Sequence, residues 1–277
     1  MKIITDTASL YTPTTGQPLG IDVLPLSVTV DNKTYQEFVE ITSEEFLTKV
    51  KAGFIPSSSQ PSVGHTIELF EKYKDEDVLV LSMADGLSGT YQSTLGARES
   101  VESNQNIHVI NTRTLCGPHR YIVQRAVALR DQGCSIQEVI EQLQPSIENS
   151  MSYLIPSDFG FLKRGGRLTP VAARIAGLIK IVPVMQTVEQ GRRIEKFTVK
   201  KTLKGGVKDV CADMKKNGVD ESYQISVSHA GVLELGQAVL EQIKQEFKDT
   251  EICLYDLSPA FITQGGPGCV AIQYVKK

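Results

Sequence analysis

The first half of the chain alternates short apolar runs with longer segments in which apolar residues recur every three or four positions. Apolar runs of four to eight residues are typical of buried strands, and the longer periodic segments are typical of helices. We expect strands at 2–5, 23–30, 77–82 and 107–110, and helices that begin at Ser43 and Ser62 or cover 89–102, 120–131 and 136–148. Strands separated by helices predict a mainly parallel sheet flanked by helices, because parallel neighbours need a crossover connection.

The second half has a different pattern. Two strand-like runs, 180–188 and 192–199, flank a short turn and predict an antiparallel hairpin. The other elements expected here are helices at 203–216 and 233–247 and strands at 223–228, 251–257 and 269–275. This arrangement predicts a second α/β unit with a mixed sheet.

A helical pattern ends near Ser150, and a new apolar run starts there. A chain of 277 residues is long for one core. We therefore expect two α/β domains, residues 1–149 and 150–277.

Composition and charge narrow the class of protein. With 41% hydrophobic and 22% charged residues, the chain is typical of a globular protein, and its net charge of −3 provides no global positive field for nucleic acid. The five scattered cysteines and four histidines form no C-x-x-C and no close pair. We expect no metal site, no disulfide framework and no cofactor, and a reducing cytoplasm as the location. No signal-peptide core and no membrane-spanning apolar run is recognisable.

Three segments rich in small residues lie where a strand or turn would lead into a helix. The first, residues 56–62, offers the hydroxyls of Ser58 and Ser59, and the second, residues 82–91, offers Ser88 and the amide of Gly89. Hydroxyls beside free helix-terminal amides suit a carboxylate or a phosphate. The alternatives are a serine-capped turn for the first segment and a capped glycine turn for the second. The third, residues 264–268, indicates only a tight turn.

A fourth segment, residues 161–168, is basic and broken by glycines. It carries Lys163, Arg164 and Arg167, and Arg174 and Lys180 continue the positive charge. It is either a docking patch for an acidic partner or a phosphate, or a solvated loop that caps the following helix.

Catalysis has weaker support in the sequence. No G-x-S-x-G motif occurs, and only Asp6 and His229 are candidate bases for a serine nucleophile. A hydrolase or transferase that acts on a small anionic substrate at a Ser58/Ser88 cleft is therefore one reading. A bare interaction protein that uses the patch from Lys163 to Arg167 is another.

Taken in order, these segments resemble the DegV family. The matching motifs are Thr5-Asp6-Thr7, Ser58-Ser59-Gln60-Pro61-Ser62, residues 87–93 for L-S-G-T-Y-Q-S, Asn111-Thr112, residues 161–168 for F-L-K-[KR]-G-G-R-[IL], and Gly266-Pro267-Gly268. The match spans nearly the whole chain, and the ordered set is more specific than any single motif.

The resemblance implies a cytoplasmic bacterial protein with two α/β domains that holds a long-chain fatty acid between them. It also implies a carrier without catalytic residues, which presents the acid to a separate fatty acid kinase subunit for acyl-phosphate formation in phospholipid synthesis, with transient membrane contact. Carried over by position, the ligand-binding residues are Ser58, Ser59, Ser88, Gly89, Gln264 and Gly266. The positions that would face the kinase are Lys163, Arg164 and Arg167.

Two positions depart from the family pattern. Serine replaces threonine at Ser58, which keeps the hydroxyl, and glutamine replaces histidine at Gln264. Glutamine donates hydrogen bonds but supplies no charge and shuttles no proton. For the acyl tail, the resemblance suggests the apolar runs 175–179 and 259–262 as lining, with ordinary core as the alternative.

Overall fold

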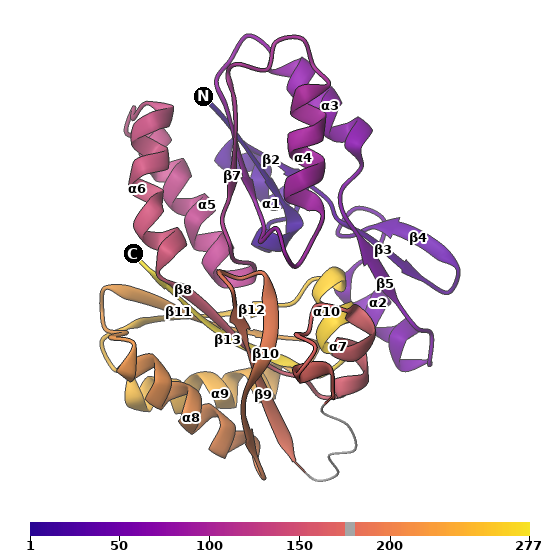
Figure 1. Cartoon of the computed structure of the whole chain (residues 1–277), viewed down its shortest axis with the longest axis vertical. Coiled ribbons are helices and arrows are strands. Elements are labelled where there is room, and N and C mark those ends of the chain that lie inside the picture. The colour runs from indigo at the N-terminus through magenta and orange to yellow at the C-terminus, as the bar shows by residue number, and fades with distance from the viewer. Residues whose placement is uncertain (175–180) are drawn as a thin grey trace.

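The computed structural model of the chain describes residues 1–174 and 181–277 (Figure 1). The described part is an α/β protein with a four-stranded parallel sheet, a six-stranded mixed sheet and a small three-stranded sheet. The fold class predicted from the sequence is therefore confirmed. The apolar run 175–179, the charge of Lys180 and the side chain of Arg174 lie outside the described residues.

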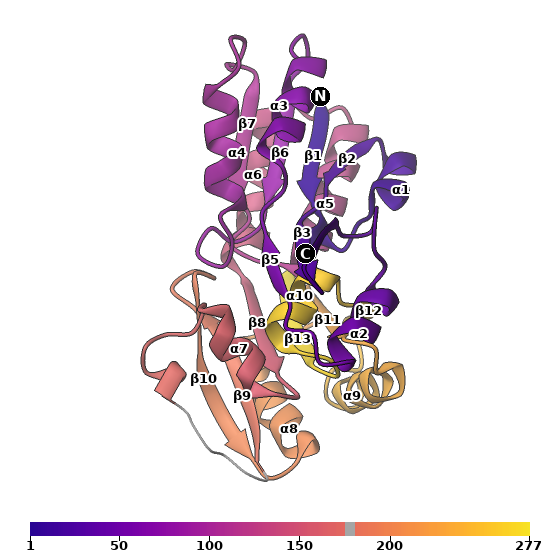
Figure 2. The ribbon, with the colours of Figure 1, turned by 90° about the vertical axis from the view of Figure 1, so that its right-hand side faces the viewer.

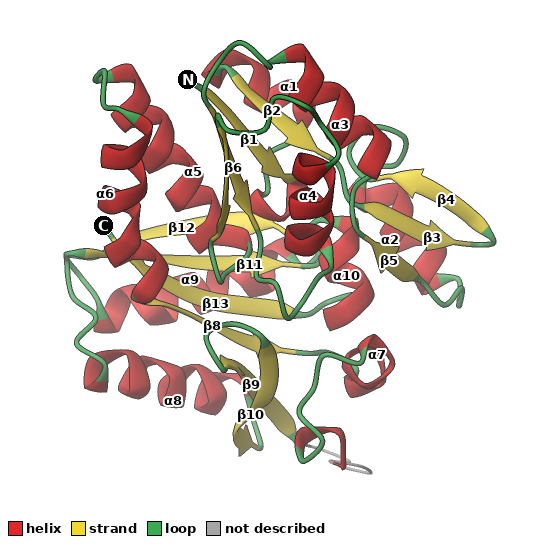
Figure 3. Cartoon of the chain, turned by 45° about the horizontal axis from the view of Figure 1, so that its top comes forward, coloured by secondary structure: helices red, strands yellow, loops and turns green. Residues whose placement is uncertain are grey.

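The parallel sheet belongs to the first half of the chain. Its strands β1 (Lys2–Asp6), β2 (Ile21–Leu24), β6 (Val78–Ser82) and β7 (Ile107–Asn111) lie in the order β2-β1-β6-β7. Successive side chains of a strand point to opposite faces. Ile3 and Leu81 accordingly pack against α5 (Cys116–Asp131) and α6 (Ile136–Glu148), whereas Ile4 and Val80 pack against α3 (Val63–Lys72) and α4 (Thr90–Glu99) (Figure 3).

The three-stranded sheet was not predicted. It contains β3 (Ser27–Val30), β4 (Lys33–Gln36) and β5 (Ser57–Ser59), in the order β4-β3-β5, and α2 (Ser43–Lys51) lies beside it. The single strand expected at 23–30 is two strands, because β2 ends before Pro25 and β3 pairs in the new sheet. Proline lacks the N–H that a continuing ladder needs.

The six-stranded sheet belongs to the second half. Its strands are β8 (Ser150–Ile155), β9 (Val182–Val188), β10 (Arg193–Lys200), β11 (Tyr223–His229), β12 (Glu251–Asp256) and β13 (Val270–Lys276), in the order β10-β9-β8-β13-β11-β12. β9 and β10 form the predicted hairpin, and β11 and β12 pair in parallel. The domain boundary expected after residue 149 stays a prediction, although β8 begins at Ser150.

The two faces of this sheet differ in chemistry. One face, which includes Tyr153 and Val227, packs against α8 (Leu203–Lys216) and α9 (Leu233–Glu246). The opposite face, which contacts α5, carries the polar residues Ser152, Ser226 and Gln273. The polar face is buried between the two halves of the protein.

Two short helices occur where the sequence indicated a loop and a turn. These are α7 (Phe159–Gly165) and α10 (Pro259–Gly265), each too short to show helical periodicity. α10 contacts α2, β3 and β5, so a helix from the end of the chain packs against the N-terminal half (Figure 2). This packing places α10 beside the first hydroxyl-rich segment.

Candidate functional site

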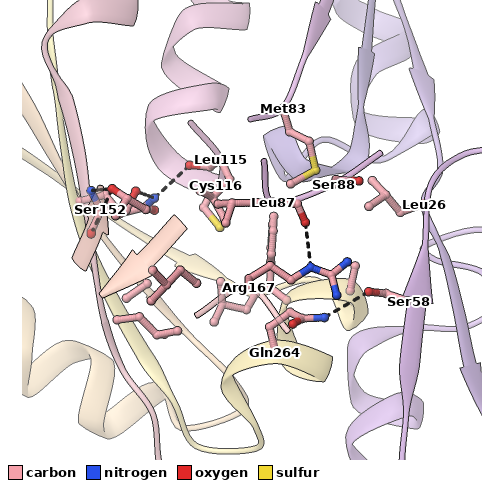
Figure 4. A pocket seen from close by; sticks show the side chains of 18 of the residues that line it. Leu26, Ser58, Met83, Leu87, Ser88, Leu115, Cys116, Ser152, Arg167 and Gln264 are labelled. Carbon is pink, nitrogen blue, oxygen red and sulfur yellow. Dashed lines mark hydrogen bonds between the residues drawn. The ribbon is translucent and has the colours of Figure 1, made fainter. Parts of the chain in front are cut away.

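A cavity of about 420 Å³ lies between the two larger sheets. Its walls come from β5, the loop after β6, the start of α5, strands β8, β9 and β13, and α10. Ligand pockets of proteins span about 300–1,000 Å³, so the cavity has the size of a small-molecule site. Leu26, Met83, Leu115, Leu154 and Phe261 are among the apolar side chains that line it (Figure 4).

The first hydroxyl-rich segment reaches the cavity through strand β5. The hydroxyl of Ser58 accepts hydrogen bonds from Thr263 Oγ1 at 3.3 Å and from Gln264 Nε2 at 3.4 Å. Ser59 also lines the cavity. Strand pairing between β5 and β3 holds these serines in place, so the expected turn is a short edge strand.

The second segment lies on another wall. The Ser88 hydroxyl is 2.8 Å from Thr90 Oγ1 and accepts the Thr90 backbone N–H at 3.3 Å. Gly89 caps the N-terminus of α4, and a Cβ atom there would overlap Gln60 Oε1. Both residues line the cavity together with Ser58. That the three share one anion site stays a prediction. The amides at this helix end favour negative charge.

The basic segment divides into outward and inward residues. Lys163 and Arg164 are exposed in the last turn of α7 and do not line the cavity. Arg167 does line it, and its Nε donates to the carbonyl of Leu87 at 3.0 Å. Burial lowers the pKa of this half-buried guanidinium. Arg167 is the one charged side chain among the described residues of the cavity wall, whereas the sequence placed it on the outer patch.

Gln264 lies beside Ser58 on the cavity wall. Its Oε1 atom is buried and has no hydrogen-bond partner among the described residues, and it packs directly against Gly165. Gly266 lies outside the cavity. Its φ is +80°, and a Cβ atom there would lie 2.8 Å from the Phe161 ring. The structure therefore gives Gly266 a role in packing α10 against α7.

The two candidate bases lie away from the serines, since neither Asp6 nor His229 lines the cavity. Asp6 accepts the backbone N–H groups of Ala8 and Met83, both at 3.0 Å, and burial raises its pKa to about 7. His229 is buried at the end of β11, with Nδ1 3.3 Å from Asp256 Oδ1. Neither base is placed to activate Ser58 or Ser88.

Sequence reasoning missed one buried carboxyl group beside the site. Glu37 is fully buried, accepts the Ala260 backbone N–H at 2.8 Å and accepts a hydrogen bond from Thr7 Oγ1. Burial raises its pKa to about 7. Glu37 thus connects the N-terminal half to the first turn of α10, which forms part of the cavity wall. The surrounding Q-E-F-V-E pattern gives no signal of this burial.

Of the apolar run 259–262, Ala260 and Phe261 line the cavity and Ile262 is in the core. No group of three or more His, Cys, Asp or Glu side chains suitable for a metal ion occurs in the described ranges 1–174 and 181–277. Within the same ranges, none of the helices has both the length and the apolar character needed to cross a membrane.

The fold and the cavity define an α/β protein with two larger sheets and a mainly apolar pocket between them, whose wall includes the hydroxyls of Ser58 and Ser88. A family model described as "Uncharacterised protein, DegV family" matches residues 1–277. A DegV domain-containing protein of Halalkalibacterium halodurans is 29% identical, over 100% of this chain and 99% of that protein. The chain belongs to the DegV family.

Solved structures agree on the fold. A structure described as fatty acid binding of a DegV family protein from Thermus thermophilus superposes with a TM-score of 0.90 at 23% identity, over 100% of this chain and 99% of that one. The structure of DegV, a fatty acid binding protein from Bacillus subtilis, superposes with a TM-score of 0.86 at 24% identity, with the same coverage. The present chain therefore shares the whole architecture of these proteins.

Proposed function

We propose that this protein binds one long-chain fatty acid in the cavity between its sheets and carries it without transforming it. The observation that supports this most is the cavity itself, whose walls are mainly apolar and carry the hydroxyls of Ser58 and Ser88, the amide of Gly89 and the guanidinium of Arg167. The Bacillus subtilis and Thermus thermophilus relatives are described as fatty acid binding proteins.

The carboxylate belongs at the end formed by Ser58, Ser88, Gly89 and Arg167. An ionised carboxylate accepts several hydrogen bonds and is costly to bury without them. Two hydroxyls, a helix-terminal amide and a half-buried guanidinium supply these donors. Gln264 adds a neutral amide where the family pattern has histidine.

The tail supplies most of the affinity. Burial of each methylene contributes about 0.8 kcal/mol, so a tail of about 14 to 16 methylenes gives roughly 11–13 kcal/mol before the costs of association. Leu87, Leu154, Ile194 and Phe261 are positioned to contact this tail.

The rest of the proposal concerns partners and location. The exposed cations Lys163 and Arg164 would face a separate fatty acid kinase subunit, which would phosphorylate the bound carboxylate for phospholipid synthesis. The carrier would work in the cytoplasm, where its five free cysteines remain reduced, and would load and unload by transient membrane contact.

Mass spectrometry of an organic extract of the purified protein tests the proposal first. About one fatty acid per chain supports a carrier and identifies its ligand. A folded protein that yields none and does not bind an added fluorescent fatty acid would refute the proposal.

A matched pair of serine variants tests the position of the carboxylate. Ser88→Ala removes one hydrogen bond to a charged group and should weaken fatty acid binding by about 1.5–3 kcal/mol, which is about 10- to 150-fold. Ser93→Ala is the control, since Ser93 lies on α4, just after Ser88 in the chain, and outside the cavity. Equal affinities of the two variants would remove Ser88 from the site.

A further inference from the structure

The wall of the cavity that lies across from Ser58 is polar. Ser152, Thr187 and Gln273 all line it, and they come from the neighbouring strands β8, β9 and β13. Gln273 pairs with Ser152 across the β13–β8 ladder, and Thr187 Oγ1 accepts the Ser152 backbone N–H at 3.3 Å. These three residues therefore form one row across the sheet, which we call the polar row. Figure 4 shows Ser152 on the opposite side of the pocket from Ser58 and Gln264.

The adjacent row of the same sheet face is apolar. Two residues further along β8, Leu154 pairs with Ala271 on one side and with Met185 on the other. Leu154 also lies near the end of α10, because its Cδ1 is 3.5 Å from the position of a Cβ atom on Gly265. An acyl chain that starts at the Ser58 end thus passes the apolar row before it reaches the polar row.

The hydrogen bonds of the polar row leave one donor free. Gln273 Nε2 donates to Ser152 Oγ at 2.6 Å and to the Leu115 carbonyl at 3.0 Å, and Gln273 Oε1 accepts the Gly117 backbone N–H at 3.3 Å. Both amide hydrogens of Gln273 are therefore used. The Ser152 hydroxyl accepts from Gln273, and its own hydrogen has no acceptor among the described residues.

A purely hydrocarbon tail leaves this donor unpaired against a methyl group, which is unfavourable in a buried site. An oxygen atom on the tail accepts the hydrogen bond instead. We infer that the pocket is adapted to an oxygenated acyl chain, that is, a hydroxy or oxo fatty acid whose distal oxygen accepts the Ser152 O–H. This inference rests on the proposed fatty acid binding and specifies the class of ligand.

Binding of palmitic acid is compared with binding of hydroxypalmitic acids that carry the hydroxyl at mid-chain or at the terminal carbon. Displacement of a fluorescent fatty acid measures each affinity. In an apolar pocket the extra hydroxyl weakens binding, because it loses its hydrogen bonds to water. Here at least one hydroxypalmitic acid should bind as tightly as palmitic acid or more tightly.

The Ser152→Ala variant isolates the proposed contact. It should lower the affinity for the preferred hydroxypalmitic acid by about three- to tenfold, the range of one neutral hydrogen bond, and should not weaken palmitic acid. Ser226→Ala is the matched control. Ser226 pairs with Gln273 on the same sheet face and is buried, but it does not line the cavity.

The outcomes separate this inference from the proposed function. Failure to bind any of these acids would refute the proposed function. Good binding of palmitic acid, with every hydroxypalmitic acid bound more weakly than palmitic acid, would overturn the inference alone. Equal losses of affinity for both ligands in Ser152→Ala would also overturn the inference, since Ser152 would then only support the sheet.

Discussion

Replacing Arg167 with glutamine tests whether the inward cation, rather than the hydroxyls alone, holds the carboxylate. Of the five N–H donors of a guanidinium, one goes to Leu87 and one to the Gly165 carbonyl, which leaves three for a ligand. A hydrogen bond to a charged partner contributes about 1.5–3 kcal/mol. Because Arg167 is half-buried and partly screened by water, we expect the lower end, about a tenfold loss of affinity.

The assay compares palmitic acid with hexadecanol, which has the same tail length but no carboxylate. Arg167→Gln should weaken the binding of palmitic acid by about tenfold and change the affinity for hexadecanol by less than about twofold. Only the acid carries the charge that the guanidinium contacts. Arg164→Gln is the matched control, because Arg164 is a cation of the same segment that lies outside the cavity. The control variant should change the affinity for neither ligand.

Two results would refute this reasoning. If Arg167→Gln weakened both ligands equally, the side chain would act through its bond to Leu87, as a support for the Ser88 loop. If Arg164→Gln matched Arg167→Gln, the effect would come from long-range charge rather than from contact. Thermal unfolding of each variant shows whether the fold is retained.

Three further predictions concern the surroundings of the site. Burial raises the pKa of Glu37 from 4.5 to about 7, so the native state binds more protons than the unfolded chain between these values. The free energy of unfolding should fall as pH rises through this window, with a shallower slope in Glu37→Gln, as measured by urea unfolding. Gln264→His should strengthen fatty acid binding as pH falls below about 6.5, where histidine becomes charged; a pH-independent affinity would argue against contact with the carboxylate. Gly191→Ala should destabilise the fold by more than about 1 kcal/mol, because Gly191 has a φ of +83° and a Cβ atom would overlap the Arg113 carbonyl. Gly218→Ala, where φ is +74° and the space is open, should destabilise the fold less. Equal losses of stability in the two variants would mean that backbone strain, and not the overlap with Arg113, causes the loss.

Local chemistry made much of the fold predictable. The strand β6 is a continuous apolar run bounded by polar residues, and α8 has the bounds that its periodicity predicts. The hairpin of β9 and β10 was visible because two strand-like runs flank a turn that ends in Gly191. These features depend on neighbours in the sequence, so the sequence alone was sufficient.

The short elements were not predictable in this way. β5 has three residues and α10 has seven, and each is stabilised by partners that are distant in the chain. Glu37 looks like a solvated carboxylate in the sequence, and only its tertiary contacts, with Thr7 and with Ala260 of α10, bury it. Tertiary contacts outweigh weak local preferences in such segments.

The sequence by itself determined the α/β class and the family, because motif order and apolar periodicity are properties of the sequence. It also predicted the hydroxyl pair Ser58 and Ser88. Only the tertiary structure decided that Arg167 turns into the cavity while Arg164 faces outward. It also placed Ser152 and Gln273 on the wall across from Ser58. The physical reason is that the direction of a side chain and the identity of the opposing wall depend on how two sheets pack together. The residues adjacent in the sequence do not determine that packing.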